Sequence, residues 1–161
     1  MAATLEDALV LVAKAEAAAE LGRDLALQGL YEEAIQELGK AIQLDPDFAR
    51  TYVDRGDVYD YIEDFERAMD DYDKAIRLKP DYALTYLQRG LVYAKLEEWQ
   101  RAMEDFDTLI NLYPDATDPY DGGNLAARAH WSRSMVLGAL GQHSLAEEDS
   151  RKACELDRAL C

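Results

Sequence analysis

The sequence predicts an all-α fold, a right-handed solenoid of about four helix–turn–helix units with eight helices. The main observation is a period of 34 residues, at which small residues, prolines and rings recur. Such a period is typical of stacked helical pairs, because one pair cannot bury its apolar face alone. The recurring residues are Gly22, Gly56 and Gly90; Ala34, Ala68 and Ala102; Pro46, Pro80 and Pro114; and Tyr31, Phe65 and Trp99.

Composition supports a folded helical chain. With 161 residues, 49% of them hydrophobic and 31% charged, the chain can bury a core and is not of the disordered class. Only four prolines occur, and residues that favour helices dominate. Helices are expected near 5–28, 31–44, 49–62, 65–78, 83–96, 99–112, 125–140 and 143–159.

The units follow from these helices. In the second unit, Gly56 and Ala68 are small because the two helices must approach closely, and Tyr59 and Tyr72 fill the space beside them. We assign 15–48, 49–82 and 83–116 to three full units. Residues 1–14 extend the first helix as an N-terminal cap with Thr4 as its N-cap residue.

A fourth unit is degraded. Ala146 matches Ala102 only with ten residues beyond the period, and this surplus falls in the turn-rich segment 117–126, assigned as an insertion loop. Ser150 stands where the other units have a ring or a leucine. Residues 127–161 are therefore expected to form a degenerate unit that acts as a C-terminal cap.

The order of a ring, Leu-Gly, a second ring, alanine, a third ring, alanine and proline resembles the tetratricopeptide repeat family. The resemblance is strong over residues 15–116 and weak over 127–160, with Arg55 and Arg89 where the family usually has leucine. It implies a protein-binding solenoid whose first helices line a concave groove. The groove residues that it implies here are Arg23, Val53, Asp57, Tyr61, Leu87, Leu91, Lys95, Trp131 and Met135.

The expected groove is polar toward the N-terminus and apolar toward the C-terminus. Leu87, Leu91, Trp131 and Met135 are expected to form an apolar lining that solvent reaches, with Trp131 as the anchor. The alternative is that Trp131 and Met135 pack beneath the insertion loop. The lysines and asparagines with which related grooves clamp chaperone C-termini are missing from the matching positions, which argues against that ligand.

The net charge of −16 excludes some partners. An acidic chain repels the phosphates of nucleic acids and of anionic membranes. The charge serves solubility or favours a basic partner that also carries apolar anchors. We expect a monomer or a weak homodimer.

One charge pattern follows the repeat. Arginine recurs on the first helix of the last three units, and an acid recurs on the second helix of all four. Because a desolvated unpaired charge is costly, each arginine is expected to bind an acid of its own or an adjacent unit, and partner recognition is the alternative. The residues are Arg55, Arg89 and Arg133, with Glu37, Asp71, Asp105 and Asp149.

No pattern predicts catalysis, a cofactor or a metal. His130 and His143 lack the spacing of metal ligands, and the oxygen-rich stretch 115–124 lacks the pattern of an EF-hand and is interpreted as an acidic turn. Cys154 and Cys161 are seven residues apart, about 10.5 Å along a helix, which predicts two reduced thiols. No signal peptide or membrane span is recognised, so a cytoplasmic location is expected.

Two functions follow. The first is a non-catalytic protein-interaction module that binds a peptide or helix in its groove, as an adaptor or assembly factor. The alternative is a structural scaffold subunit that assembles with copies of itself.

Overall fold

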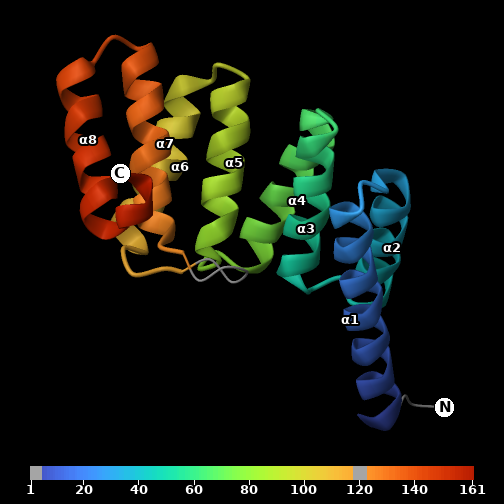
Figure 1. The fold of residues 1–161 in the computed structure, drawn as a ribbon. Coiled ribbons are helices and arrows are strands. Elements are labelled where there is room, and N and C mark those ends of the chain that lie inside the picture. Colours follow the sequence, from blue (N-terminus) through green and yellow to red (C-terminus); the bar gives the residue numbers. More distant parts are fainter. Residues whose placement is uncertain (1–4, 118–122) are drawn as a thin grey trace. The chain divides into compact units, whose positions relative to one another are not determined.

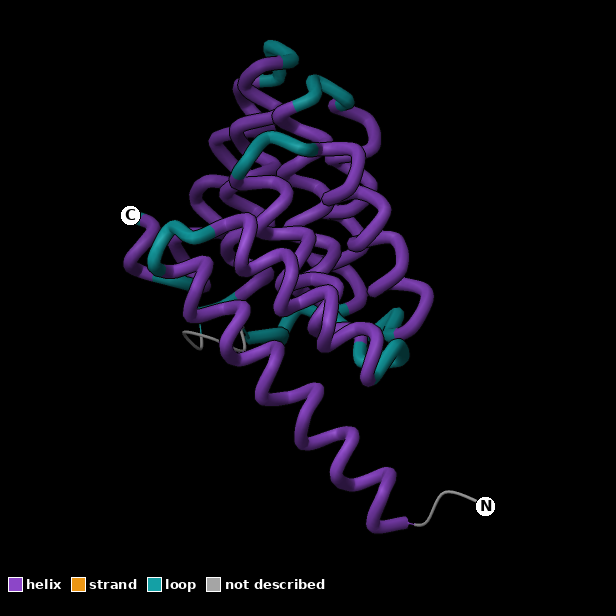
Figure 2. Tube along the Cα trace, turned by 90° about the vertical axis from the view of Figure 1, so that its right-hand side faces the viewer, coloured by secondary structure: helices purple, strands orange, loops and turns teal. Residues whose placement is uncertain are grey.

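The computed structural model describes residues 5–117 and 123–161, and over those residues it contains eight α-helices and no strand (Figure 1). Figure 2 shows that short loops join the helices. The all-α class is confirmed; an isolated bridge joins Thr117 to Asn124. The helices are α1 (Leu5–Leu27), α2 (Tyr31–Leu44), α3 (Ala49–Tyr61), α4 (Phe65–Leu78), α5 (Ala83–Lys95), α6 (Trp99–Leu112), α7 (Leu125–Ala139) and α8 (His143–Leu156), followed by the 3₁₀-helix η1 (Arg158–Leu160).

The chain forms two compact units, Met1–Pro80 with α1 to α4 and Asp81–Cys161 with α5 to α8 and η1. In each unit, consecutive helices pack as hairpins, α1 with α2 and α3 with α4, then α5 with α6 and α7 with α8. The first helices of the two hairpins also touch, as α1 does with α3 and α5 with α7. None of the described helices is both long enough and apolar enough to cross a bilayer.

The helix bounds confirm the expected ones to within a residue, except at α8. That helix ends at Leu156 because the next residue, Asp157, has an extended backbone. Asn124 caps α7 by accepting a hydrogen bond from the backbone N–H of Ala127 at 2.8 Å. The expected N-cap, Thr4, and part of the insertion loop lie outside the described residues.

The turn inside each hairpin has one geometry. Its central residue has a positive φ, at Gly29, Glu63, Glu97 and Gly141. The next backbone N–H donates to a carbonyl five residues earlier, as Asp64 does to Tyr59 at 2.9 Å. This arrangement satisfies the carbonyls at the end of the first helix and reverses the chain.

Glycine sets how closely the hairpin helices approach. A Cβ atom built on Gly56 would lie 2.7 Å from the ring of Tyr72, and one built on Gly90 would lie 2.7 Å from the ring of Phe106. On Gly22 it would lie 2.6 Å from Leu38. The predicted close approach is therefore present in the first three hairpins.

The fourth hairpin differs at this contact. Ser134 stands in the glycine position, and Ser150 replaces the large side chain opposite. Ser134 is buried, and its hydroxyl donates to the carbonyl oxygen of Trp131 at 2.7 Å. Two small residues therefore replace one glycine and one ring, consistent with the degraded sequence of this hairpin.

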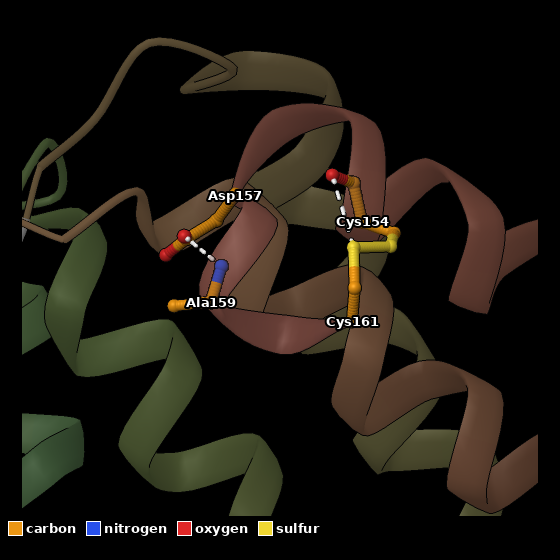
Figure 3. Close-up of a disulfide and its surroundings, with 4 residues drawn as sticks. All are labelled: Cys154, Asp157, Ala159 and Cys161. Carbon is orange, nitrogen blue, oxygen red and sulfur yellow. Dashed lines mark hydrogen bonds between the residues drawn. A yellow bond between two sulfur atoms is a disulfide. The ribbon is translucent and has the colours of Figure 1, made fainter.

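The prediction of reduced thiols at Cys154 and Cys161 is wrong. A disulfide joins the two residues, whose Cα atoms lie 5.2 Å apart (Figure 3). The spacing argument assumed one continuous helix, but α8 ends at Leu156 and η1 turns the chain back. Asp157 stabilises this turn, since its carboxylate accepts a hydrogen bond from the backbone N–H of Ala159 at 2.9 Å.

The glycine contact gives a stability prediction. Gly90→Ala should lower the free energy of unfolding by about 1–3 kcal/mol, because the new methyl group meets the buried ring of Phe106. Gly138→Ala is the control: no atom lies within 4 Å of its Cβ position, so helix propensity should raise stability by about 0.5 kcal/mol. Urea denaturation measures both, and equal effects would contradict a steric role for Gly90.

Candidate functional site

In the first unit, most of the predicted groove residues are engaged within the fold. Arg23 donates to Asp54 at 2.9 Å, which joins α1 to α3. Asp57 accepts a hydrogen bond from the hydroxyl of Tyr72 at 2.8 Å. Tyr61 is 68% exposed, and its ring centroid lies 4.6 Å from that of Tyr31.

Two predicted groove residues cannot contact a partner. Val53 and Leu87 have no exposed surface, so the expectation that solvent reaches Leu87 is wrong. Each lies three residues before the glycine of its helix, Gly56 or Gly90, and residues at this spacing share a helix face. That face is packed inside the protein, and Ala19, three residues before Gly22, is buried in the same way.

In the second unit, the remaining predicted residues reach solvent. Leu91 on α5 is half-buried and Lys95 is exposed. On α7, Trp131 is 42% exposed and Met135 is 64% exposed. Residues four apart lie on the same side of a helix, so Trp131 and Met135 form one apolar surface, here called the α7 face. The interpretation that Trp131 packs fully beneath the insertion loop does not hold.

The exposure of Trp131 has a structural cause. It precedes Ser134 by three residues and therefore occupies the position that is buried in the first three hairpins. In the second unit α7 packs against α5, α6 and α8, and the described residues place no further first helix beside it. A large ring at a position that is otherwise buried is thus left accessible.

The arginine–acid series is confirmed as structural. Arg55 binds Asp71 through two hydrogen bonds of 2.8 and 2.7 Å. Arg89 binds Asp105 in the same way, at 2.9 and 2.7 Å. Each acid belongs to the arginine's own hairpin and is buried. Two parallel bonds to a carboxylate are the strongest form of this interaction.

Arg133 has a larger set of partners. It donates twice to Asp149, at 2.6 Å in each case, and it also contacts Asp107 of the preceding helix α6. His130 lies beside the same carboxylate, with its Nδ1 atom 2.9 Å from Asp149. The four side chains connect α6, α7 and α8. The sequence pattern predicted the bond between Arg133 and Asp149 but not the contacts of His130 and Asp107.

These contacts set the protonation of Asp149. Burial raises the pKa of its carboxyl group, but the hydrogen bonds from Arg133 and His130 outweigh burial and hold the pKa below its ordinary value. The hydrogen bonds of Arg133 to Asp149 and to Asp107 raise the pKa of its guanidinium. Asp149 and Arg133 therefore form a charged pair at neutral pH.

A cleft of about 650 Å³ lies over this cluster, between α6 and α8. Leu137 and Leu145 form part of its wall. At the equivalent positions the preceding hairpin has Tyr93 and Arg101, and the guanidinium of Arg101 lies 5.4 Å from the ring centroid of Tyr93. Smaller side chains thus open the cleft. The donors of Arg133 are directed at Asp107 and Asp149, so the floor is not an anion site. Among the described residues, no group of His, Cys, Asp and Glu could hold a metal ion.

The chain consists of repeated helical hairpins, and the first helix of the last hairpin carries the solvent-exposed Trp131. This architecture defines a helical-repeat protein of the class that binds other proteins. Two sequence families described as "Tetratricopeptide repeat" match residues 58–120 and 127–160, and one described as "TPR repeat" matches residues 22–60. The chain belongs to the tetratricopeptide repeat family, whose fold is that of a protein-interaction module.

Solved structures resemble the chain closely. A crystal structure of MamA is 28% identical with a TM-score of 0.76, covering 90% of this chain and 79% of that one. The first tetratricopeptide repeat domain of Spaghetti (RPAP3), bound to the HSP90 peptide SRMEEVD, is 25% identical with a TM-score of 0.69, covering 80% and 94%. PilF of Pseudomonas aeruginosa shares the fold at 20% identity, with a TM-score of 0.78, covering 90% and 62%. No curated protein sequence matches this chain.

The bidentate pairs give a second prediction. Arg89→Leu should lower the free energy of unfolding by about 3–5 kcal/mol, because it removes the cation that is paired with the buried carboxylate of Asp105. The double variant Arg89→Leu, Asp105→Val should recover most of the loss. A double-mutant cycle from urea denaturation measures the coupling, and additive losses would show that the pair does not act as a unit.

The cluster at Asp149 gives a third prediction. Because its folded pKa lies below the unfolded value, the stabilisation is complete above about pH 5 and is lost as the pH falls toward the folded pKa. The stability difference between the wild type and Asp149→Asn should therefore shrink as the pH falls below 5. Glu147→Gln, at an exposed site on α8, is the control in acid denaturation. A difference that stays constant with pH would contradict the pKa direction.

Proposed function

We propose that this protein is a non-catalytic adaptor or assembly factor, and that its α7 face anchors a peptide or helix of a partner protein. The partner inserts an apolar side chain beside Trp131 and Met135, with Leu91 of α5 as a further contact. The single observation that carries the proposal is the exposure of Trp131, 42%, at a position that is buried in the other hairpins.

The chemistry of the residues supports this role. Binding hot spots favour large rings that can be fully desolvated, and tryptophan is prominent among them. Methionine adapts its flexible, polarisable side chain to ligands of different shape. A ring that is already partly held by its own helix loses little conformational freedom on binding, which favours affinity.

The charge of the chain supports a basic partner. At −16, long-range attraction accelerates encounter with a ligand that carries lysine or arginine, and it repels acidic ligands. The acids bonded to arginine contribute little, because Asp54, Asp71, Asp105 and Asp149 are neutralised by their partners. The charge that can attract a basic ligand therefore lies on other carboxylates, which are more exposed.

An acidic chaperone tail is a poorer candidate, although the RPAP3 domain is solved with such a peptide. At the clamp positions of the first compact unit, Asp54 is buried, and the guanidinium of Arg23 is bonded to its carboxylate. The positive charge of Arg23 is therefore already compensated by Asp54 and attracts the C-terminus of an acidic ligand only weakly. We therefore propose apolar and basic peptides as ligands.

A peptide-display selection tests the function. Random peptides selected on the wild-type chain should be enriched in apolar residues flanked by lysine or arginine. Trp131→Ala should weaken their binding at least about tenfold in calorimetry, because the anchor is lost. Binding should also weaken with added salt, because charge attraction is screened.

Leu112→Ala is the matched control. Leu112 is 65% exposed on α6 in the same unit, so its truncation removes a comparable apolar surface away from α7. Binding should be unchanged in this variant, and the peptide SRMEEVD should not bind the wild type. Selected peptides that bind Trp131→Ala as tightly as the wild type would refute the anchor role of the α7 face.

A further inference from the structure

The first ten residues of α1 lie outside the hairpin. Helix α1 has 23 residues and its partner α2 has 14, so at 1.5 Å per residue α1 is about 13 Å longer than α2. Figure 1 and Figure 2 show that the N-terminal part of α1 continues past the end of α2. The residues of α1 that are buried are Ala15, Ala19 and Gly22. Every residue from Leu5 to Lys14 is exposed.

The exposed part continues the apolar stripe that packs on α2. Stepping back by three or four residues from Ala15 leads to Leu11 and Val12, and then to Ala8 and Leu5. Leu5 is 81% exposed, Leu11 46% and Val12 44%. Such a stripe faces a partner in folded proteins, and a short helix is marginal in water without one.

The charges beside this stripe are self-complementary. Asp7 and Lys14 are seven residues apart and therefore lie on the same side of the helix. Asp7 directly precedes Ala8 of the stripe, and Lys14 directly precedes Ala15, so both charges flank the same edge of the stripe. When two such helices pack antiparallel, this flank of one faces the same flank of the other. Asp7 of one copy then meets Lys14 of the second copy, and the pair forms twice.

Other arrangements lack this match. In a parallel pair, the same flank would face the apolar positions Leu5 and Val12, so that no charge pair would form. A basic partner helix would meet Lys14, and an anionic membrane surface would meet Asp7. The stripe and its flank fit a second copy of this chain in antiparallel orientation better than either.

We propose that residues 5–15 of α1 form an antiparallel, two-fold-symmetric contact with the same segment of a second copy. Leu11 of each helix packs against Ala8 of the other, Leu5 packs against Val12, and Asp7 binds Lys14. This contact is continuous with the interface between α1 and α2, and it is independent of the partner surface on α7. A helix pair of this length buries less than the roughly 1,200 Å² of a standard interface, so the dimer is concentration-dependent.

Sedimentation velocity of the full chain from low to several hundred micromolar tests the contact, with reductant present so that no disulfide links the copies. The wild type should shift from monomer to dimer. Leu11→Glu should weaken the dimer at least about tenfold, because it places a carboxylate in the contact. Val10→Glu is the matched control: Val10 is 48% exposed but points away from the stripe, so dimerisation should persist.

A charge swap tests the orientation. Asp7→Lys alone and Lys14→Glu alone should each be monomeric, because like charges then face each other in the pair. An equal mixture of the two variants should form a dimer, since opposite charges meet at both places. The mixing experiment distinguishes an antiparallel contact from general stickiness of an apolar helix.

Three results would overturn the proposal. The first is a wild-type chain that stays monomeric throughout the concentration range. The second is equal loss of the dimer in Leu11→Glu and Val10→Glu. The third is failure of the two charge variants to associate when mixed. Circular dichroism of each variant shows whether the helices are retained, and trimming of residues 1–14 should abolish the dimer without unfolding the hairpins.

Discussion

In the first three hairpins, the distance between the two helices is set by a glycine that faces a large side chain sixteen residues later. The pairs are Gly22 with Leu38, Gly56 with Tyr72 and Gly90 with Phe106. No methyl group fits at these contacts, so the two helices can pack in one axial alignment only. The arginine–acid pairs depend on that alignment, because Arg55 and Arg89 precede the glycines by one residue, and their acids precede the rings by one residue.

The fourth hairpin shows how the ion pair and the steric contact divide this role. Ser134 and Ser150 remove the contact between glycine and ring, yet Arg133 still reaches Asp149 at the same offset. Two further contacts are added there, from His130 to Asp149 and from Arg133 to Asp107. Polar bonds thus hold the alignment of α7 and α8 where side-chain volume no longer does, and the cleft lined by Leu137 and Leu145 lies beside these bonds.

The sequence was sufficient for features that repeat. Helix ends follow from proline and from the positive-φ turns, and the half-buried arginines required acids at one fixed spacing. It was insufficient where a residue's surroundings come from another hairpin: Val53 and Leu87 look like groove residues in a linear count but share the face of a packed glycine. The disulfide could not be predicted without knowing where α8 ends. The contact of His130 could not be predicted either, because its partner Asp149 lies 19 residues later, on α8.

The fixed turn inside each hairpin also determines where the chain can change length. The glycine contact and the ion pair both join residues on opposite sides of that turn. One residue added to the turn would therefore rotate the partner residues on the second helix by about 100° relative to those on the first. The links between hairpins carry no such constraint. The ten surplus residues before α7 lie in one of them, and α7 still binds α6 through Arg133 and Asp107. Lineages of this protein should therefore gain and lose residues between hairpins and keep the length within each hairpin constant.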